Sequence, residues 1–313
     1  MASKGEISEQ VARESERRAR LAVPAFAGGV IYLLSAIVIS STLNGAPTVG
    51  LLQGLGPALS GVADPPVSPR AAEVKFISHH GFALIAGSTL AAVAIGALTL
   101  ILLLLIDATR FRRPQTWAAS RPLVLAGGIG VAVVSLGHQI VSAIETHNFA
   151  VGHDFSSSAV DHALTKGTAN VITDYLDLLA GLALAVGMIS VMINAMRVGL
   201  LTRWVGIVGI FAGVLVFLPL GGAELEVVPA FWMVAIGILF VGKWPNGEPP
   251  AWASGEARPW PSQAELRAAK QAASGGQAGG NGTAPSTGTD VVPAPTPSRR
   301  SSRRRSRKPG SRR

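Results

Sequence analysis

The sequence contains no cysteine and few charged residues. The first deficit excludes several kinds of chemistry, and the second indicates the class of protein. Without cysteine the chain has no disulfide, no thiolate metal ligand, no thioether-linked haem and no lipidated cysteine. Any metal or cofactor would rest on histidine, aspartate and glutamate. Charged residues make up only 14% of the chain, whereas 49% is hydrophobic and the mean hydropathy is +0.41. A water-soluble domain of this length rarely has this composition, which therefore predicts an integral membrane protein.

The standard catalytic signatures are also missing. The sequence has no HExxH zinc motif, no phosphate-binding P-loop and no Gly-x-Ser-x-Gly nucleophile turn. The glycine-rich stretch 126–130 resembles part of a nucleotide-binding loop, but it lies inside an apolar segment without a preceding strand. We expect its glycines to allow close helix packing, and we expect the same of Gly206, Gly209 and Gly213, which share one helix face.

Six apolar segments predict an all-α fold, a polytopic membrane helix bundle with six transmembrane helices. The first four are long enough to cross a bilayer, which takes about 20 residues, and the last two are shorter. The spans are expected at about residues 21–43, 82–106, 122–144, 172–196, 204–220 and 227–241. They form one transmembrane domain over 21–242, preceded by a cytoplasmic arm over 1–20. The first span is expected to be an uncleaved anchor.

Arginine is distributed unevenly between the connecting segments. Residues 1–242 carry equal numbers of acidic and basic residues, so the formal net charge of +9 comes entirely from 243–313. The arm, the 107–121 loop and the connection between the fourth and fifth spans are also basic. Because cytoplasmic loops are enriched in Lys and Arg, we expect these segments and both termini in the cytoplasm, with 145–171 on the opposite side.

The segment 243–313 lacks the apolar content to fold and ends in SRRSSRRRSRKPGSRR, so we expect a disordered cytoplasmic tail. Its arginine block has no interleaved aromatic residues and no folded domain around it, which disfavours nucleic acid as a partner. On a membrane protein, such a block is expected to bind anionic lipid headgroups.

A polar stripe on the third span is the most specific candidate for a functional site. Ser135, His138, Ser142 and Glu145 recur at spacings of three and four residues, which places them on one helix face. His138 lies inside the span, where ionisable side chains are more often functional than elsewhere.

A matching stripe opens the fourth span, at Asn170, Asp174 and Asp177. If the third and fourth spans pack antiparallel, His138 and Glu145 face these carboxylates, and two histidines at the same depth on the second span complete the group. The candidate cluster is therefore His138, Glu145, Asp174, Asp177, His79 and His80. A purely structural role remains open, because a buried histidine bonded to a serine or aspartate can simply hold helices together.

The remaining polar residues of the long connection, His147, His153, Asp154, Asp161 and His162, show no helical metal-site spacing. We interpret them as a solvated loop.

The last two spans carry the one family resemblance. Arg203-Trp204 opens the fifth span, glycines space it, and Pro229 with Phe231-Trp232 opens a short final span that ends in Gly-Lys-Trp-Pro. In these features the chain resembles the C-terminal hairpin of uncharacterised bacterial multi-span membrane proteins that carry domain-of-unknown-function labels. The resemblance implies a bacterial inner-membrane protein and assigns no catalytic residue.

Four functional classes remain open. The lack of a catalytic signature favours a non-enzymatic scaffolding, sensory or partner-binding role. A metal-binding membrane hydrolase would use the candidate cluster to hold zinc with an open position for water. A proton or solute transporter would use the same residues as a relay. Haem ligation by His138 with His79 or His80 is the fourth class, so the cofactor stays unknown, with zinc and haem as candidates.

Overall fold

The computed structural model describes residues 3–50, 52–53, 59, 61, 67–152, 154–218, 223–245, 247–259, 265, 267–268 and 271. The chain divides into two units, Met1–Trp260 and Pro261–Arg313, and the first contains the helices described below. The arginine block of the predicted tail and His153 lie outside the described residues.

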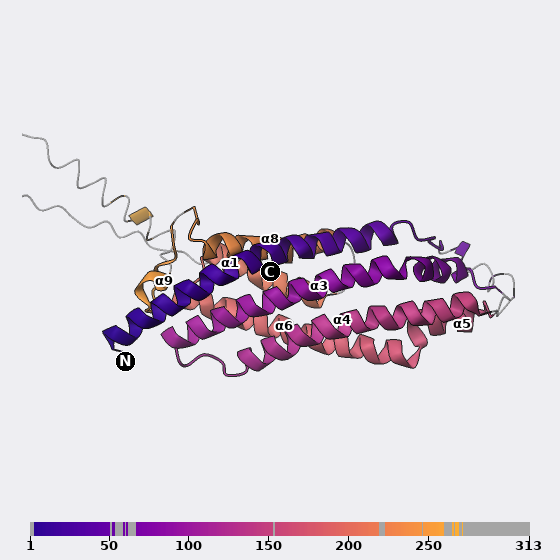
Figure 1. Ribbon diagram of the computed structural model, residues 1–313, viewed down its shortest axis with the longest axis horizontal. Coiled ribbons are helices and arrows are strands. Elements are labelled where there is room, and N and C mark those ends of the chain that lie inside the picture. Colours follow the sequence, from indigo (N-terminus) through magenta and orange to yellow (C-terminus); the bar gives the residue numbers. More distant parts are fainter. Residues whose placement is uncertain are drawn as a thin grey trace, which may run out of the picture. The chain divides into compact units, whose positions relative to one another are not determined.

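Regular structure in the described residues is entirely helical, which confirms the all-α prediction (Figure 1). The long helices are α1 (Lys4–Leu43), α3 (Ala71–Arg112), α4 (Ser120–Val151) and α6 (Thr168–Val198), and the shorter ones are α5 (Ser157–Asp161), the π-helical η1 (His162–Lys166), α7 (Arg203–Phe217), α8 (Ala223–Phe240) and α9 (Pro250–Ser254). In the part of the chain that the structure describes, four helices are long and apolar enough to cross a membrane, the fourth being α6 together with α5 and η1. The helices α7 and α8 are apolar but shorter.

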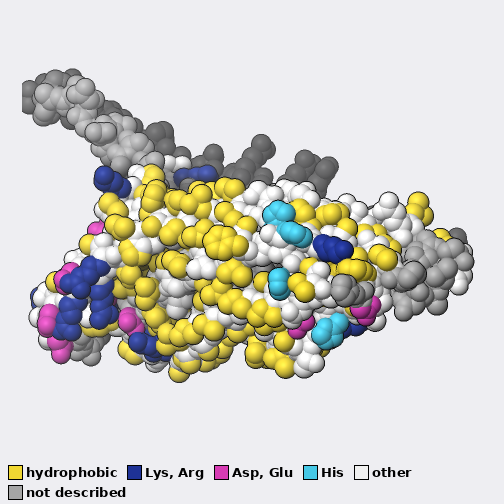
Figure 2. Space-filling model, turned by 45° about the vertical axis from the view of Figure 1, so that its right-hand side comes forward, with side chains coloured by type: hydrophobic (Ala, Val, Ile, Leu, Met, Phe, Trp, Pro, Cys, Tyr) yellow, Lys and Arg dark blue, Asp and Glu magenta, His cyan; other side chains and the backbone are white. Residues whose placement is uncertain are grey.

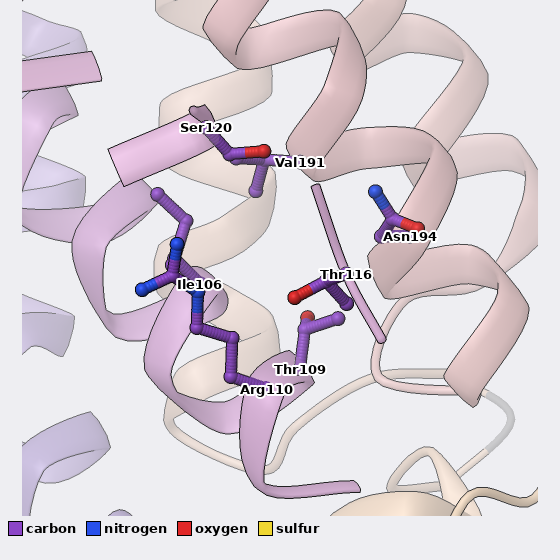
Figure 3. Close-up of a pocket in the computed structure, with 7 residues that line it drawn as sticks. All are labelled: Ile106, Thr109, Arg110, Thr116, Ser120, Val191 and Asn194. Carbon is purple, nitrogen blue, oxygen red and sulfur yellow. The ribbon is translucent and has the colours of Figure 1, made fainter. Parts of the chain in front are cut away.

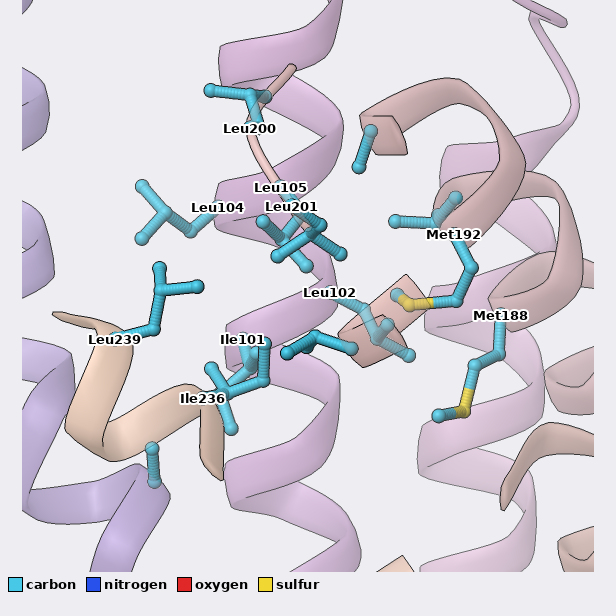
Figure 4. Close-up of a cluster of buried hydrophobic side chains, with 14 of the residues drawn as sticks. Ile101, Leu102, Leu104, Leu105, Met188, Met192, Leu200, Leu201, Ile236 and Leu239 are labelled. Carbon is cyan, nitrogen blue, oxygen red and sulfur yellow. The ribbon is translucent and has the colours of Figure 1, made fainter. Parts of the chain in front are cut away.

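Six helices of the described residues pack side by side, and α3 also contacts α6. Helix α1 lies against α3 and α8, α4 lies against α3 and α6, and α7 lies against α6 and α8. Their shared core is apolar: leucine and isoleucine side chains of α3 meet Met188 and Met192 of α6 and Ile236 and Leu239 of α8 (Figure 4). Each of these four side chains is fully buried. The long apolar runs therefore pack against one another in one shared core.

Two ends of the bundle differ in chemistry. At the end that we call the basic end, α1, α4 and α7 begin and α3, α6 and α8 end; at the opposite loop end, α1 and α4 end and α3 and α6 begin. In Figure 2, hydrophobic side chains cover the middle of the visible face, and charged side chains gather at the left, while histidines lie farther right.

Glycines set the close approach of α6 and α7, as the sequence predicts. A Cβ atom at Gly209 would lie 2.5 Å from the Sδ atom of Met192, and one at Gly213 would lie 3.3 Å from Cγ of Met188. Gly206 faces Met196 in the same way. Three methionines spaced four residues apart thus fill the hollows left by three glycines, which is the small-residue packing common between membrane helices.

Two segments expected to be separate or irregular are helical instead. The predicted arm and first span form the single helix α1, which begins with a capping box between Ser3 and Glu6. The predicted solvated loop over 145–171 contains the end of α4, α5 and η1, so Asp161 and His162 lie in helical turns. Buried apolar residues hold this region together: Ala71, Val74, Phe149, Val160 and Ala163.

The short helix α7 leaves part of α6 uncovered. Phe217, the last residue of α7, lies beside Gly181, so the preceding turns of α6 extend beyond it toward the loop end. There Tyr175 and Leu179 are 65% and 62% exposed. In this half of α6, His138 of α4 lies against Thr173 and Asp174, and η1 contacts the first turn of α6 through Asn170.

Candidate functional site

The interface between α4 and α6, which we call the seam, is built on small residues. Gly127 lies against the backbone of Leu184, Gly130 lies against Ala180, and Gly187 lies against Val124. These contacts run in opposite directions along the two helices, so α4 and α6 pack antiparallel. With little side-chain bulk between the backbones, polar groups farther along the seam are brought within hydrogen-bonding distance.

His138 forms the centre of the seam's polar part. Its Nδ1 atom lies 3.1 Å from Oγ1 of Thr173 and 3.2 Å from Oδ1 of Asp174. The Thr173 hydroxyl already lies 2.9 Å from the carbonyl oxygens of Ala169 and Asn170, and it has a single hydrogen to donate. It therefore accepts from His138, which assigns the proton of the neutral imidazole to Nδ1 and leaves Nε2 to take up the second proton.

Asp177 lies one turn beyond Asp174 on the same face of α6. Its Oδ1 atom is buried and has no hydrogen-bond partner among the described residues. A buried carboxylate oxygen without a hydrogen-bond partner is costly in free energy.

Glu145 belongs to a separate pair at the loop end. Its Oε2 atom lies 3.7 Å from Nδ1 of His162, whose side chain is 63% exposed. The predicted contact of Glu145 with the aspartates of α6 is thus replaced by one with η1. The reason is that η1 packs against α4, and Asn170 in the first turn of α6 donates to the carbonyl oxygen of Ala163 in η1 at 3.2 Å.

The two histidines of α3 are bonded to their own helix. Nδ1 of His79 lies 2.6 Å from the carbonyl oxygen of Lys75, and Nδ1 of His80 lies 2.9 Å from that of Phe76. The His80 ring also stacks on the Phe76 ring, with centroids 4.0 Å apart. Over the described part of the chain, no three His, Asp or Glu side chains are arranged to hold a metal ion. The predicted cluster therefore separates into three groups, of which His138, Asp174 and Asp177 form the central one.

A second group of polar residues, at the basic end, was not anticipated from the sequence. Arg112 forms a salt bridge with Glu14, and both side chains are buried, with 0% and 3% exposure. The guanidinium carbons of Arg112 and Arg18 lie 5.4 Å and 4.4 Å from the ring centre of Trp252. We call Glu14, Arg18, Arg112 and Trp252 the clasp. The sequence assigned Trp252 to the tail, whereas the indole is buried and donates to the carbonyl oxygen of Leu200 at 2.9 Å.

A small cavity lies beside the clasp's helix α3, between the end of α3, the start of α4 and α6 (Figure 3). The hydroxyls of Thr109 and Thr116 are buried there without a hydrogen-bond partner in the described residues. Ser120 and Ser190 approach within 3.0 Å on the same side. The cavity measures about 10 Å³, close to the least space that holds one water molecule. It is too small for an organic ligand or a substrate.

Comparisons with known proteins identify no relative: no family model, no curated protein and no solved structure matches this chain.

Proposed function

We propose that this protein is a non-enzymatic sensor of the bacterial inner membrane, and that the seam between α4 and α6 responds to protons. The proposal includes six transmembrane spans with both termini in the cytoplasm, so that the basic end is cytoplasmic and the tail binds anionic lipid headgroups. The asymmetry of arginine supports the orientation. The hydropathy of α7 and α8 supports their crossing, although each is shorter than the other helices.

The observation that carries the proton response is the position of His138 between Thr173 and Asp174, one turn from the buried oxygen of Asp177. Histidine is the side chain that ordinarily changes charge between about pH 5 and 8. Ionisable residues within membrane spans are costly, and they commonly mark sites that bind or move charge.

Protonation changes what the seam holds together. The neutral imidazole donates from Nδ1 only, to Thr173 or Asp174. When Nε2 takes up a proton, the ring becomes positive and pairs with the Asp174 carboxylate as an ion pair. Because the two partners belong to different helices, proton uptake ties the loop end of α4 more firmly to α6.

The line of polar side chains along the seam ends inside the bundle, which favours sensing over proton conduction. From the loop end it passes the Glu145–His162 pair, then His138 with Asp174, and ends at Asp177. Farther along the core-facing side of α6 come Ala180, Leu184 and Met188, all buried and apolar. The next polar residue on α6 is Ser190, about 20 Å of helix beyond Asp177.

Spin labels test the response directly, since the chain has no cysteine of its own. Ile144 on α4 and Ile172 on α6 are both exposed at the loop end and are suitable for cysteine substitution and labelling. In lipid nanodiscs, we expect the distance distribution between the labels to be narrower at about pH 5.5 than at about pH 7.5. His138→Gln should abolish the difference.

The matched control is His79→Gln, which removes a histidine whose Nδ1 atom bonds to Lys75 of its own helix and should leave the pH response intact. A wild-type distribution that is identical at both pH values, or a response that survives His138→Gln, would refute the proton response. Proton transport is the second candidate, supported by the same residues. If vesicles containing the protein dissipate a pH gradient and Asp177→Asn stops this, transport replaces sensing.

A further inference from the structure

A surface groove between α1 and α8 suggests a second site, separate from the seam. The groove lies beside the first apolar turns of α1, at Val23, Phe26 and Ala27, and the last turns of α8, at Ile238 and Val241. Its volume is about 370 Å³, which falls within the range of about 300–1,000 Å³ typical of small-molecule sites.

Small residues create this groove. A Cβ atom at Gly237 would lie 3.1 Å from the backbone nitrogen of Phe26 and 3.3 Å from the carbonyl oxygen of Ala22. The two helix backbones are therefore in close contact at the floor of the groove. The longer side chains of Val23, Phe26 and Val241 form its walls and remain 74%, 51% and 55% exposed.

Charge is confined to one end of the groove. Lys243 lines the groove at the basic end. It is the first charged residue after α8, and it is exposed. Arg20 lies three residues before Val23 on the same side of α1, where it pairs with Glu16 on the surface. An apolar channel that ends at an ammonium group matches the shape of a lipid, with a chain along the helices and a negative headgroup at the end.

We propose that this groove binds an anionic phospholipid, with one acyl chain between α1 and α8 and the phosphate on Lys243. The site requires only that α1 and α8 lie in a membrane, and it does not depend on the proton response of the seam. A second copy of the chain fits less well. A two-fold axis normal to the membrane would place both Lys243 residues at one depth, close together, where like charges repel.

Native mass spectrometry of the full-length protein tests the site with phosphatidylglycerol and phosphatidylcholine of identical chains. We expect phosphatidylglycerol to be retained in preference, and Lys243→Gln to lower its retention about fivefold, as loss of one cation near an anionic lipid predicts. Val241→Trp should remove the bound lipid by filling the groove.

Two matched controls separate the groove from other exposed positions and from general damage. Val133→Trp makes the same change at a 64% exposed site on α4, and Lys4→Gln removes an exposed cation elsewhere at the basic end. Both should retain phosphatidylglycerol as the wild type does. If Val241→Trp and Lys243→Gln also retain it, the lipid is held elsewhere and the proposal fails. If the wild type gives the mass of a dimer and Val241→Trp gives only that of a monomer, a second copy covers the groove. This result would also overturn the lipid proposal.

Discussion

The guanidinium of Arg112 on α3 donates two hydrogen bonds to the carboxylate of Glu14 on α1, at 3.0 and 2.7 Å. Arg112 also donates to the carbonyl oxygen of Ala251 at the start of α9, at 3.0 and 2.8 Å. This pair therefore joins three segments that are far apart in the sequence. Because both side chains are buried, each depends on the other for its counter-charge.

Glu14→Ala should be strongly destabilising, since it leaves Arg112 buried without a counter-charge. Removing one partner of a buried ion pair typically costs about 3–5 kcal/mol. The matched control is Glu9→Ala, which breaks an exposed pair with Arg13 on the same helix and should leave stability unchanged within error. Thermal unfolding in detergent measures both variants. Equal unfolding midpoints would mean that the clasp does not contribute to stability.

Gly209→Ala and Gly213→Ala should differ although they lie four residues apart on one helix face. A Cβ atom at position 209 would lie 2.6 Å from Nε1 of Trp232, which is buried and bonded to the Val205 carbonyl oxygen at 3.0 Å. At position 213 the nearest atoms belong to a methionine side chain that can adjust.

Overpacking at Gly209 should cost about 1–3 kcal/mol, whereas Gly213→Ala should be close to neutral or slightly stabilising because alanine is the better helix former. Unfolding midpoints in detergent give the comparison. Similar losses at both positions would contradict the packing described for α6 and α7.

The start of α1 should respond to acid. Oε2 of Glu6 accepts a hydrogen bond from the backbone nitrogen of Ser3 at 2.6 Å, and this bond, followed by one with the Ser3 side chain, lowers the pKa of Glu6 from its ordinary 4.5. A lowered pKa in the folded state means that the stabilisation is complete above the unfolded pKa and disappears as the pH falls through the folded value.

We therefore expect the first turn of α1 to fray below about pH 4. Amide hydrogen exchange of Glu6 to Ser8 would measure this fraying as faster exchange. Glu6→Gln keeps an acceptor but cannot titrate, so its exchange should lose this acid-dependent step. Persistence of the step in Glu6→Gln would assign it to another group.

The proposed orientation of the spans predicts opposite sidedness for two connecting segments. Reporter fusions at Thr116, between α3 and α4, should indicate the cytoplasm, and fusions at Ser157, in α5, should indicate the opposite side. If both sites lie on one side of the membrane, the six-span arrangement is wrong.

Local patterns in the sequence predicted much of the helix packing. The three-residue and four-residue spacing of Gly206, Gly209 and Gly213 identifies one face, and that face meets α6. The same reasoning placed His138 opposite Asp174, since antiparallel neighbours bring the stripes of α4 and α6 to one seam. Periodicity succeeds here because each pattern lies on one helix and its partner lies on the next helix of the main bundle.

Long-range contacts and helix rotation could not be predicted in this way. No periodic pattern relates Glu14 to Arg112, which are 98 residues apart, or places Trp252 between them. Next to His79 and His80, Gly81 faces Ala143 of α4, five residues from His138, and both histidines bond to carbonyl oxygens of their own helix. Helix length was also underestimated at α1, where pairs such as Arg20–Glu16 and the capping box support helix before the apolar run.

The short α7 gives the bundle unequal cross-sections. Near the basic end all six main helices are present, whereas toward the loop end α6 continues past Phe217 without α7 beside it. Tyr175 and Leu179, on these uncovered turns, are 65% and 62% exposed, so the length of one helix determines which part of α6 is available for contact from outside the bundle.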